Sequence, residues 1–268
     1  MIKTMQETIS SSTGRRSAIL QLLKQNSNIS VIELSRKFGV SEVTIRKDLN
    51  LLKERNLLVR TRGGAILHET RKDDNDTSIR FKKLANFREK KAIGRAAANL
   101  IKEGDTIIID SGTTALQVAC NLHRFRNLTI ITNALNVAQE VLSYKRFNVI
   151  LLGGNIRNAS ESVVGALAES NLKMFYCDKL FMGVDSFSVE NGLSTPNVEE
   201  ANINQLMISR SKEVIAVFDS SKVNKRALAF ITTLDKIDRI VTDDGMDKST
   251  RSHLTSMNVA VITAKADQ

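Results

Sequence analysis

Seven short apolar runs, separated by segments with helical spacing, fill the last three quarters of the chain. In order they are TIIID, LTIIT, NVILL, KLFMGV, EVIAVF, RIVT and VAVI. Helix-like segments such as NALNVAQEVLS, VVGALAESNLKMF and EEANINQLMISRS lie between them. Strands that alternate with helices are typical of a mostly parallel sheet covered by helices. No period of about 20 to 50 residues repeats, which excludes a solenoid.

Polar residues gather directly after five of these runs, where the strands should end. DSGTT follows the first run, a Thr-Asn pair the second and GGN the third, while GVD closes the fourth and DSSK follows the fifth. In open α/β sheets, ligands bind outside the carboxyl ends of the strands. Five polar turns in register therefore predict one binding site rather than five unrelated loops.

The residues of these turns suit a phosphorylated sugar or polyol. Backbone N–H groups at the start of a helix favour an oxyanion, and the hydroxyls of DSGTT would add donors. Lys222 would supply positive charge, and the carboxylates of Asp110, Asp185 and Glu200 can accept hydrogen bonds from sugar hydroxyls. A plain structural role stays open for three of them. Lys222 can be a solvated turn lysine, Asp110 a carboxylate that caps its own turn, and Glu200 an ordinary helix residue.

Positive charge is concentrated at the N-terminal end of the chain. Residues 1–72 contain 14 Lys and Arg against 6 Asp and Glu, a net charge of +8. The remaining 196 residues contain 25 against 23, a net charge of +2. This concentration suggests a polyanion-binding module attached to a nearly neutral body.

Helical spacing in the basic segment predicts three helices. The second, ISVIELSRKFGV, ends at Gly39, and the third begins at the N-cap Ser41 and runs through EVTIRKDLNLLKER. Ile45, Leu49 and Leu52 form the buried stripe of the third helix. A helix, a tight turn and a second helix form the helix-turn-helix arrangement, whose second helix lies in the major groove. LLVRTRGGAIL follows, with two strand-like pieces that predict a β-wing.

Outward-facing polar and basic side chains of this unit are the candidate DNA contacts. Arg and Lys donate to guanine edges or phosphates, and hydroxyls near a helix N-terminus bind phosphate. The predicted set is Ser41, Thr44, Arg46, Lys47, Asn50, Arg60 and Arg62. Asp48 lies beside the buried stripe, and we expect it to be structural. The alternative, a three-helix unit that binds only protein, is disfavoured by the basic excess and the wing together.

The segment RRSAILQLLKQNSNISVIELSRKFGVSEVTIRKDLNLLKERNLLVRTRGGA resembles the N-terminal signature of the DeoR family of bacterial transcription regulators. Two positions depart from that pattern: Lys47 stands where the family usually has a second arginine, and Arg62 where a histidine is frequent. Both keep or add positive charge, so they bear on which operator is recognised rather than on whether DNA is bound.

The resemblance extends over the body through DSGTT, TN, GG, GVD, GLSTPNVEEA and DSSK. These look like the family's sensor domain, which is similar in fold to ribose-5-phosphate isomerase and glucosamine-6-phosphate deaminase. The resemblance implies a phosphorylated sugar effector. By motif it assigns the effector residues Asp110, Ser111, Gly112, Thr113, Thr114, Thr132, Asn133, Gly153, Gly154, Asp185, Thr195, Glu200 and Lys222. STPNVEEANINQLM and DSSKVNKRALAFI are similar to the amino-sugar (N-acetylgalactosamine, AgaR-like) branch.

We therefore predict an α/β protein with a winged helix-turn-helix over 1–68, a linker over 69–88 and a mostly parallel sensor domain over 89–268. The predicted function is repression of a sugar-catabolism operon, relieved by a phosphorylated sugar, with double-stranded operator DNA as partner. The resemblance implies a homodimer or homotetramer. The alternatives are a sugar-phosphate isomerase or deaminase, and a sequence-independent DNA-binding protein whose body only oligomerises. The strand-end turns contain no histidine, and no Ser-His-Asp spacing occurs, which argues against catalysis.

Other classes of protein are disfavoured by what the sequence lacks. Cys120 and Cys177 are isolated from each other and from the scattered histidines, so we expect buried thiols, no metal site and no cofactor. The apolar runs are too short to span a membrane, and MIKTMQETISSSTGRR lacks the apolar stretch of a signal peptide. We therefore expect a cytoplasmic protein with no membrane partner.

Overall fold

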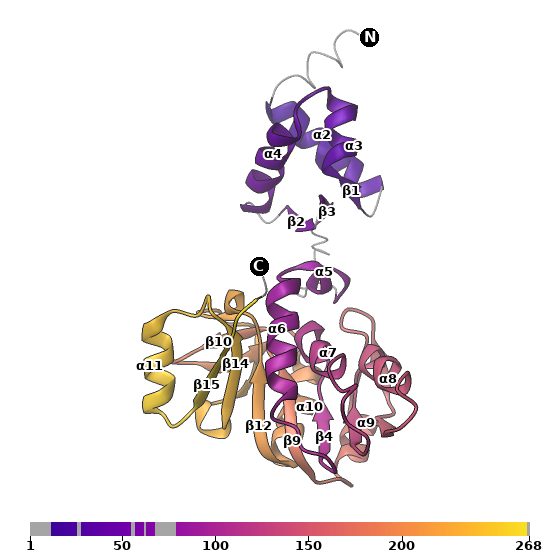
Figure 1. Ribbon diagram of the computed structural model, residues 1–268, viewed down its shortest axis with the longest axis vertical. Helices are drawn as coiled ribbons and strands as arrows, with labels where there is room; N and C mark the ends of the chain where they lie inside the picture. The colour runs from indigo at the N-terminus through magenta and orange to yellow at the C-terminus, as the bar shows by residue number, and fades with distance from the viewer. Residues whose placement is uncertain (1–11, 26–27, 55–56, 62, 68–78, 267–268) are drawn as a thin grey trace. The chain divides into compact units, whose positions relative to one another are not determined.

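The computed structural model describes residues 12–25, 28–54, 57–61, 63–67 and 79–266 (Figure 1). The chain forms two compact units, residues 1–85 and 86–268. No helix in the described ranges is long and apolar enough to cross a membrane.

The first unit is a winged helix-turn-helix. Its helices are α2 (Ser12–Gln25), α3 (Val31–Phe38), α4 (Glu42–Glu54) and α5 (Ile79–Leu84). Its strands are β1 (Ile29–Ser30), β2 (Leu58–Thr61) and β3 (Gly64–Leu67), which form an antiparallel sheet in the order β1-β3-β2. This confirms the predicted arrangement of three helices and a β-wing.

Local signals in the sequence set the ends of α3 and α4. Ser30 and Glu33 form a capping box at the start of α3, and Gly39 ends it in the left-handed conformation with a φ of 63°. The Ser41 hydroxyl oxygen accepts a hydrogen bond from the Thr44 backbone N–H at 3.2 Å, which caps α4 as predicted. The tight turn between the two helices therefore follows from residues 39–41.

A buried ion pair joins α4 to α2 inside this unit. Arg15 Nε lies 2.6 Å from Asp48 Oδ2, and the two side chains are only 8% and 5% exposed. Arg16 lies beside the same carboxylate, with its Nε 3.9 Å from Oδ1. Ile45 and Leu49, which flank this pair on α4, are fully buried in the apolar core. Asp48 thus has the structural role expected for it.

The second unit is built on a seven-stranded sheet. Its strands are β4 (Thr106–Ile109), β5 (Thr129–Thr132), β6 (Asn148–Leu151), β9 (Cys177–Gly183), β12 (Ser211–Val217), β14 (Arg239–Asp243) and β15 (Ala260–Ala264). They lie in the order β15-β14-β12-β9-β4-β5-β6, and every neighbouring pair is parallel. The seven apolar runs are these seven strands, which confirms the predicted α/β fold class.

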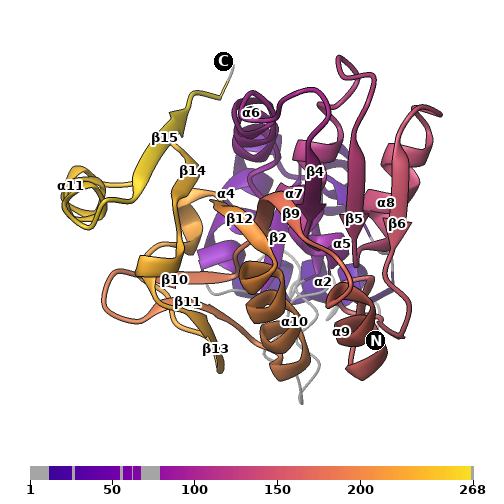
Figure 2. The ribbon, with the colours of Figure 1, turned by 90° about the horizontal axis from the view of Figure 1, so that it is seen from below.

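Helices cover both faces of this sheet (Figure 2). One face carries α6 (Phe87–Ala98), α7 (Thr113–Ala119) and α8 (Leu135–Leu142). The other carries α9 (Ala166–Leu172), α10 (Val198–Ser209) and α11 (Lys248–Ser256). Side chains alternate along each strand, so Ile107 and Ile109 enter the first core layer while Ile108 enters the second.

Two small sheets and two 3-10 turns were not expected from the sequence. β7 (Asn155–Arg157) and β8 (Ser162–Val164) form a hairpin, and η1 (Ser220–Lys222) and η2 (Leu234–Lys236) are 3-10 turns. β10 (Ser186–Ser188), β11 (Gly192–Thr195) and β13 (Ala229–Thr232) form an antiparallel sheet. The helix predicted over VVGALAESNLKMF is therefore shorter than expected, because its first two valines belong to β8.

The predicted linker, 69–88, falls only partly within the described residues. Residues 69–78 lie outside them, and the rest contain α5 and the start of α6. The domain limits at 68 and 89 stay predictions.

Cys177 is buried and Cys120 half-buried, and burial raises the pKa of each thiol to about 11.

We predict that Asp48→Asn destabilises the first unit by about 3 to 5 kcal/mol, because it leaves the Arg15 guanidinium buried without its counter-charge. Hydrogen exchange of the α4 amides in the full chain measures this loss. Glu42→Gln is the matched control, since it breaks an exposed ion pair on the same helix, with Arg46, that is worth at most about 1 kcal/mol. Equal protection in the two variants would contradict a structural role for the buried pair.

Candidate functional site

The order of the strands places a crevice between β4 and β9. From β4 the chain continues through β5 and β6 to one side of the sheet, whereas β9, β12, β14 and β15 follow on the other side. Ligands of open α/β sheets bind at such a switch point, outside the carboxyl ends of the strands. Residues 110–114 directly follow β4, and Asp185 comes two residues after β9.

Asp110 lies fully buried at the base of this crevice. Its Oδ2 accepts a hydrogen bond from the Gly183 N–H at 3.2 Å, and Oδ1 has no hydrogen bond of good geometry among the described residues. Burial raises the pKa of this carboxyl to about 7, and the charge of Glu200 adds to the rise. Hydrogen bonds from the Ser111 N–H, the Asn204 side chain and the Gly183 N–H lower the pKa and offset part of this rise. A carboxyl with this pKa is half protonated near neutrality.

Glu200 is the second carboxylate of the crevice. It stands in the first turn of α10, where its backbone N–H donates to the capping Asn197 side chain at 3.0 Å. The Thr195 hydroxyl lies 3.2 Å from a Glu200 oxygen and 3.4 Å from an Asp185 oxygen, and donates to one of them at a time. Three of the predicted effector residues, Asp185, Thr195 and Glu200, thus meet in one cluster.

Arg157 and Ser162, from the β7–β8 hairpin, complete this cluster and were missed from the sequence. Arg157 Nη1 lies 3.5 Å from Glu200 Oε1, and the Ser162 hydroxyl donates to the same oxygen at 3.4 Å. The arginine side chain is 12% exposed, so it brings a nearly buried positive charge to the Glu200 carboxylate. Nothing local distinguishes Arg157 in the sequence, because the hairpin that positions it was itself not predicted.

The turn after β4 has the backbone shape of an anion cradle. Gly112 has a φ of 109°, a conformation that side-chain-bearing residues rarely adopt, and its next two residues begin α7. Thr113 and Thr114 are each 7% exposed, whereas Ser111 is half-buried. This turn lies at the same edge of the sheet as the cluster around Glu200, since the charge of Glu200 acts on Asp110.

Four of the predicted effector residues hold the neighbouring turns. Thr132 and Asn133 are fully buried: the Thr132 hydroxyl oxygen accepts from the Ala134 N–H at 3.1 Å, and Asn133 Nδ2 donates to the Val163 carbonyl at 3.3 Å. The Gly153 N–H donates to the Asn171 side chain at 3.0 Å. Gly154 packs so closely on β8 that a Cβ would lie 3.0 Å from the Val164 carbonyl oxygen. Their observed contacts are with the protein itself.

Lys222 lies in η1 near a second polar cluster, centred on Asp219. The Asp219 carboxylate accepts hydrogen bonds from Asn86 Nδ2 at 2.7 Å and the Ser221 N–H at 3.2 Å. Lys90 of α6 is 3% exposed, with its Nζ 4.0 Å from Asp219 Oδ2. This lysine was not among the predicted site residues, although a signal existed: it stands in register with the buried stripe of α6 at Ile93 and Ala97.

The candidate DNA-contacting face is the exposed side of α4. Arg46, Lys47 and Asn50 are exposed there, together with Val43, which is 72% exposed. Arg46 forms an ion pair with Glu42 at 2.8 Å, and the hydroxyls of Ser41 and Thr44 lie 2.9 Å apart at the start of the helix. These five predicted contacts therefore share one region of the unit, as the helical spacing requires.

Arg60, one of the two predicted contacts in the wing, lies against α4. It stands on β2 and its Nη1 donates to Asn50 Oδ1 at 2.8 Å and to the Arg46 carbonyl at 3.1 Å. Burial, together with the charge of Arg46, lowers the pKa of its guanidinium. Arg62, the other predicted wing contact, lies outside the described residues.

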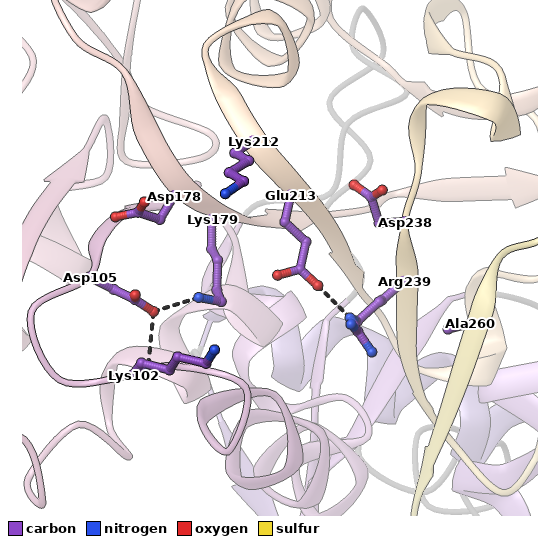
Figure 3. Close-up of a pocket in the computed structure, with 9 residues that line it drawn as sticks. All are labelled: Lys102, Asp105, Asp178, Lys179, Lys212, Glu213, Asp238, Arg239 and Ala260. Carbon is purple, nitrogen blue, oxygen red and sulfur yellow. Dashed lines mark hydrogen bonds and ion pairs between the residues drawn. The ribbon is translucent and has the colours of Figure 1, made fainter.

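A separate hollow of about 550 Å³ opens at the opposite, amino-terminal edge of the sheet (Figure 3). Its lining alternates in charge: Lys102, Asp105, Asp178, Lys179, Lys212, Glu213, Asp238, Arg239 and Ala260. Its carboxylates have partners within the protein. Asp105 pairs with Lys179 at 2.6 Å, Glu213 with Arg239, and Asp178 and Asp238 accept from strand N–H groups at 2.8 and 2.7 Å. The carboxylates of this hollow are therefore compensated within the protein, and the hollow contains none of the predicted effector residues.

Comparison with known proteins identifies relatives of both units. A family model described as the DeoR C terminal sensor domain matches residues 85–244, and the DeoR-like helix-turn-helix domain matches residues 15–71. The "Putative aga operon transcriptional repressor" of Escherichia coli O157:H7 is 34% identical over 96% of both chains. The glycerol-3-phosphate regulon repressor of Escherichia coli K12 is 32% identical, over 92% of this chain and 97% of that protein.

A further relative is the HTH-type transcriptional regulator GolR of Listeria innocua, 36% identical over 88% of this chain and 92% of that protein. Among solved structures, ribose 5-phosphate isomerase A of Methanocaldococcus jannaschii overlaps 53% of this chain and 56% of that chain. The overlap has a TM-score of 0.40 and 16% identity.

We predict that Asp110 makes the stability of the second unit fall as pH rises. Its pKa of about 7 in the folded protein exceeds the ordinary 3.8, so the folded state binds the proton more tightly. The resulting stabilisation is complete below pH 3.8 and is lost as pH rises towards 7, by at most about 1.4 kcal/mol per pH unit.

Urea unfolding of wild type and Asp110→Asn across this range checks the effect. In the asparagine variant, the free energy of unfolding should lack this contribution to its dependence on pH. Above pH 7 the variant should therefore gain stability relative to wild type. Glu190→Gln, which removes an exposed carboxylate between β10 and β11, should follow wild type. Parallel curves for wild type and Asp110→Asn would show that the carboxyl titrates normally.

Proposed function

The chain belongs to the DeoR family of transcriptional regulators, and from this we propose that it represses a sugar-catabolism operon and leaves its operator when a phosphorylated sugar binds. The proposed partners are double-stranded operator DNA and a second copy of the chain, as a homodimer or homotetramer. Two copies would present two α4 helices to two half-sites. The proposal locates the protein with the DNA in the cytoplasm.

The observation that carries the sensor half of the proposal is the cluster at the switch point. Two carboxylates, Asp110 and Glu200, lie there beside the Thr113–Thr114 turn and the nearly buried Arg157. Donors for a phosphate and acceptors for sugar hydroxyls thus occur on one edge of one sheet. The similarity to the amino-sugar branch favours a phosphorylated amino sugar, and the aga operon relative is consistent with that choice.

The contacts of Asp219 suggest how effector binding reaches the DNA-binding unit. Asn86 is the residue at which the second unit begins, and its side chain donates to Asp219 at 2.7 Å. Asp219 in turn caps η1, which contains Lys222. A ligand that repositions η1 would therefore act on the first residue of the α/β unit. It can shift the balance between two states only by its differential affinity for them, typically about 1–3 kcal/mol per site.

One observation favours a second function, that of a sugar-phosphate isomerase or deaminase. Asp110 has a pKa of about 7 and lies near another carboxylate, an arrangement that suits proton transfer. However, the Glu200 carboxylate already binds Arg157, Thr195 and Ser162. We therefore propose binding without turnover.

The proposal predicts that one sugar phosphate weakens specific DNA binding. The full chain is titrated with a duplex selected from a random library and with unselected duplex, each with and without a panel of sugar phosphates that includes amino sugars. Affinity for the selected duplex should fall by about 5- to 150-fold with the effector. If the protein consumes the compound, the alternative of an isomerase or deaminase is favoured. If its affinity is equal for both duplexes, the alternative of a sequence-independent DNA-binding protein is favoured.

Lys222→Ala should separate sensing from DNA binding. Loss of a charge-assisted hydrogen bond of about 1.5–3 kcal/mol would lower the affinity for the effector by about ten- to a hundredfold. Operator affinity should stay that of wild type. Lys225→Ala is the matched control, because it removes the same charge from an exposed position in the same loop. If both variants keep the wild-type response in a fluorescence-anisotropy titration, Lys222 does not bind the effector.

A further inference from the structure

Arg60 connects the wing to the recognition helix through two contacts one turn apart. Its Nη1 donates to the Asn50 side-chain oxygen at 2.8 Å and to the backbone carbonyl of Arg46 at 3.1 Å. The guanidinium is half-buried between β2 and α4, and its Nε is shielded from solvent. It therefore lies along α4 rather than reaching outward in the manner of a side chain that binds DNA phosphates.

This contact fixes the orientation of the Asn50 amide. A guanidinium has five donors and no acceptor, so only the oxygen of an amide can face it. The two ends of an asparagine amide are otherwise hard to distinguish, and their assignment follows from the hydrogen-bond network. Here the network permits one assignment: Oδ1 is directed to Arg60, and Nδ2 is the end that remains for a partner outside the unit.

An asparagine held in this way is turned away from the orientation in which it recognises adenine. Adenine is recognised by two hydrogen bonds, in which Nδ2 donates to N7 and Oδ1 accepts from N6. Arg60 occupies one of the two lone pairs of Oδ1 and turns that oxygen towards the wing, so the hydrogens of Nδ2 are the groups that Asn50 presents outward. Guanine presents two adjacent acceptors, N7 and O6, to these hydrogens. Adenine and cytosine each present an amino group that would face them, and thymine presents one acceptor, O4, beside its methyl group.

We propose that Arg60 is a positioning residue that directs the amide nitrogen of Asn50 into the major groove, so that Asn50 donates to the base edge and selects guanine at one base pair of the operator. The inference rests on the proposed function, since it requires that α4 enters the major groove of a specific site. It adds to that function the chemistry of one base contact and the residue that determines it. The preference for guanine over adenine should be about tenfold or more, as for other two-bond contacts.

The test selects binding sites from a random duplex library with the full chain and three variants. Arg60→Met retains an unbranched apolar stem but releases Oδ1, so adenine should replace guanine at one position while the other positions stay unchanged. Asn50→Asp keeps an acceptor for Arg60 but has no donor, so the same position should change to cytosine, which donates from N4. Lys53→Met removes an exposed charge from the last turn of α4 and should leave every base preference as in wild type.

Circular dichroism melting verifies the fold of each variant, and if Arg60→Met does not fold, Asn50→Asp alone decides. The proposal is overturned if Arg60→Met keeps the wild-type base preferences but binds all sequences more weakly, with a salt dependence lower by about one phosphate contact. That result would make Arg60 a phosphate contact instead of a positioning residue. It is also overturned if Asn50→Asp changes no base preference. A wild-type protein that selects no sequence at all would instead refute the proposed function.

Discussion

The parallel pairing of β4 with β9 is the constraint on which the candidate effector site depends. Parallel strands have their carboxyl ends at the same edge, and the reversal of strand order between these two keeps that edge clear of crossover connections. The turn after β4, the start of α10 and the β7–β8 hairpin can meet there for that reason. An antiparallel pair at this point would send Asp110 and Asp185 to opposite ends of the sheet.

Charge balance explains the state of the carboxylates in this crevice. Glu200 has Arg157 and two hydroxyls within hydrogen-bonding distance, so its charge is compensated. Asp110, fully buried beside that charge, has backbone and amide donors but no cation of its own, and its pKa is raised to about 7. A bound phosphate would add negative charge to the crevice and favour the protonated form of Asp110 further, whereas a nearby hydroxyl donor would favour the carboxylate.

Local sequence patterns predicted the seven strands of the parallel sheet, the cap of α4 and the polar turn after β4, because each follows from residues close together in the chain. The contacts that define the site follow from residues far apart: Arg157 and Glu200 are 43 positions apart, and Asn86 and Asp219 are 133 apart. Thr132 and Asn133 were assigned to the effector by motif, yet their observed bonds hold their own turn and the β8 strand. A motif marks where a site lies but does not distinguish a residue that contacts the ligand from one that supports it.

The same distinction applies to α4, which is fixed at two points on opposite sides. Asp48 anchors it to α2 through a buried ion pair, and Asn50, two residues later, is held by Arg60 of the wing. Successive helical positions diverge by about 100°, so these two anchors oppose rotation of the helix about its axis. The exposed residues that directly precede them, Arg46 and Lys47, then keep a constant direction. A long basic side chain tolerates error in that direction when it binds a phosphate, but an amide that must align with a base edge does not. The second anchor is therefore needed at Asn50 itself.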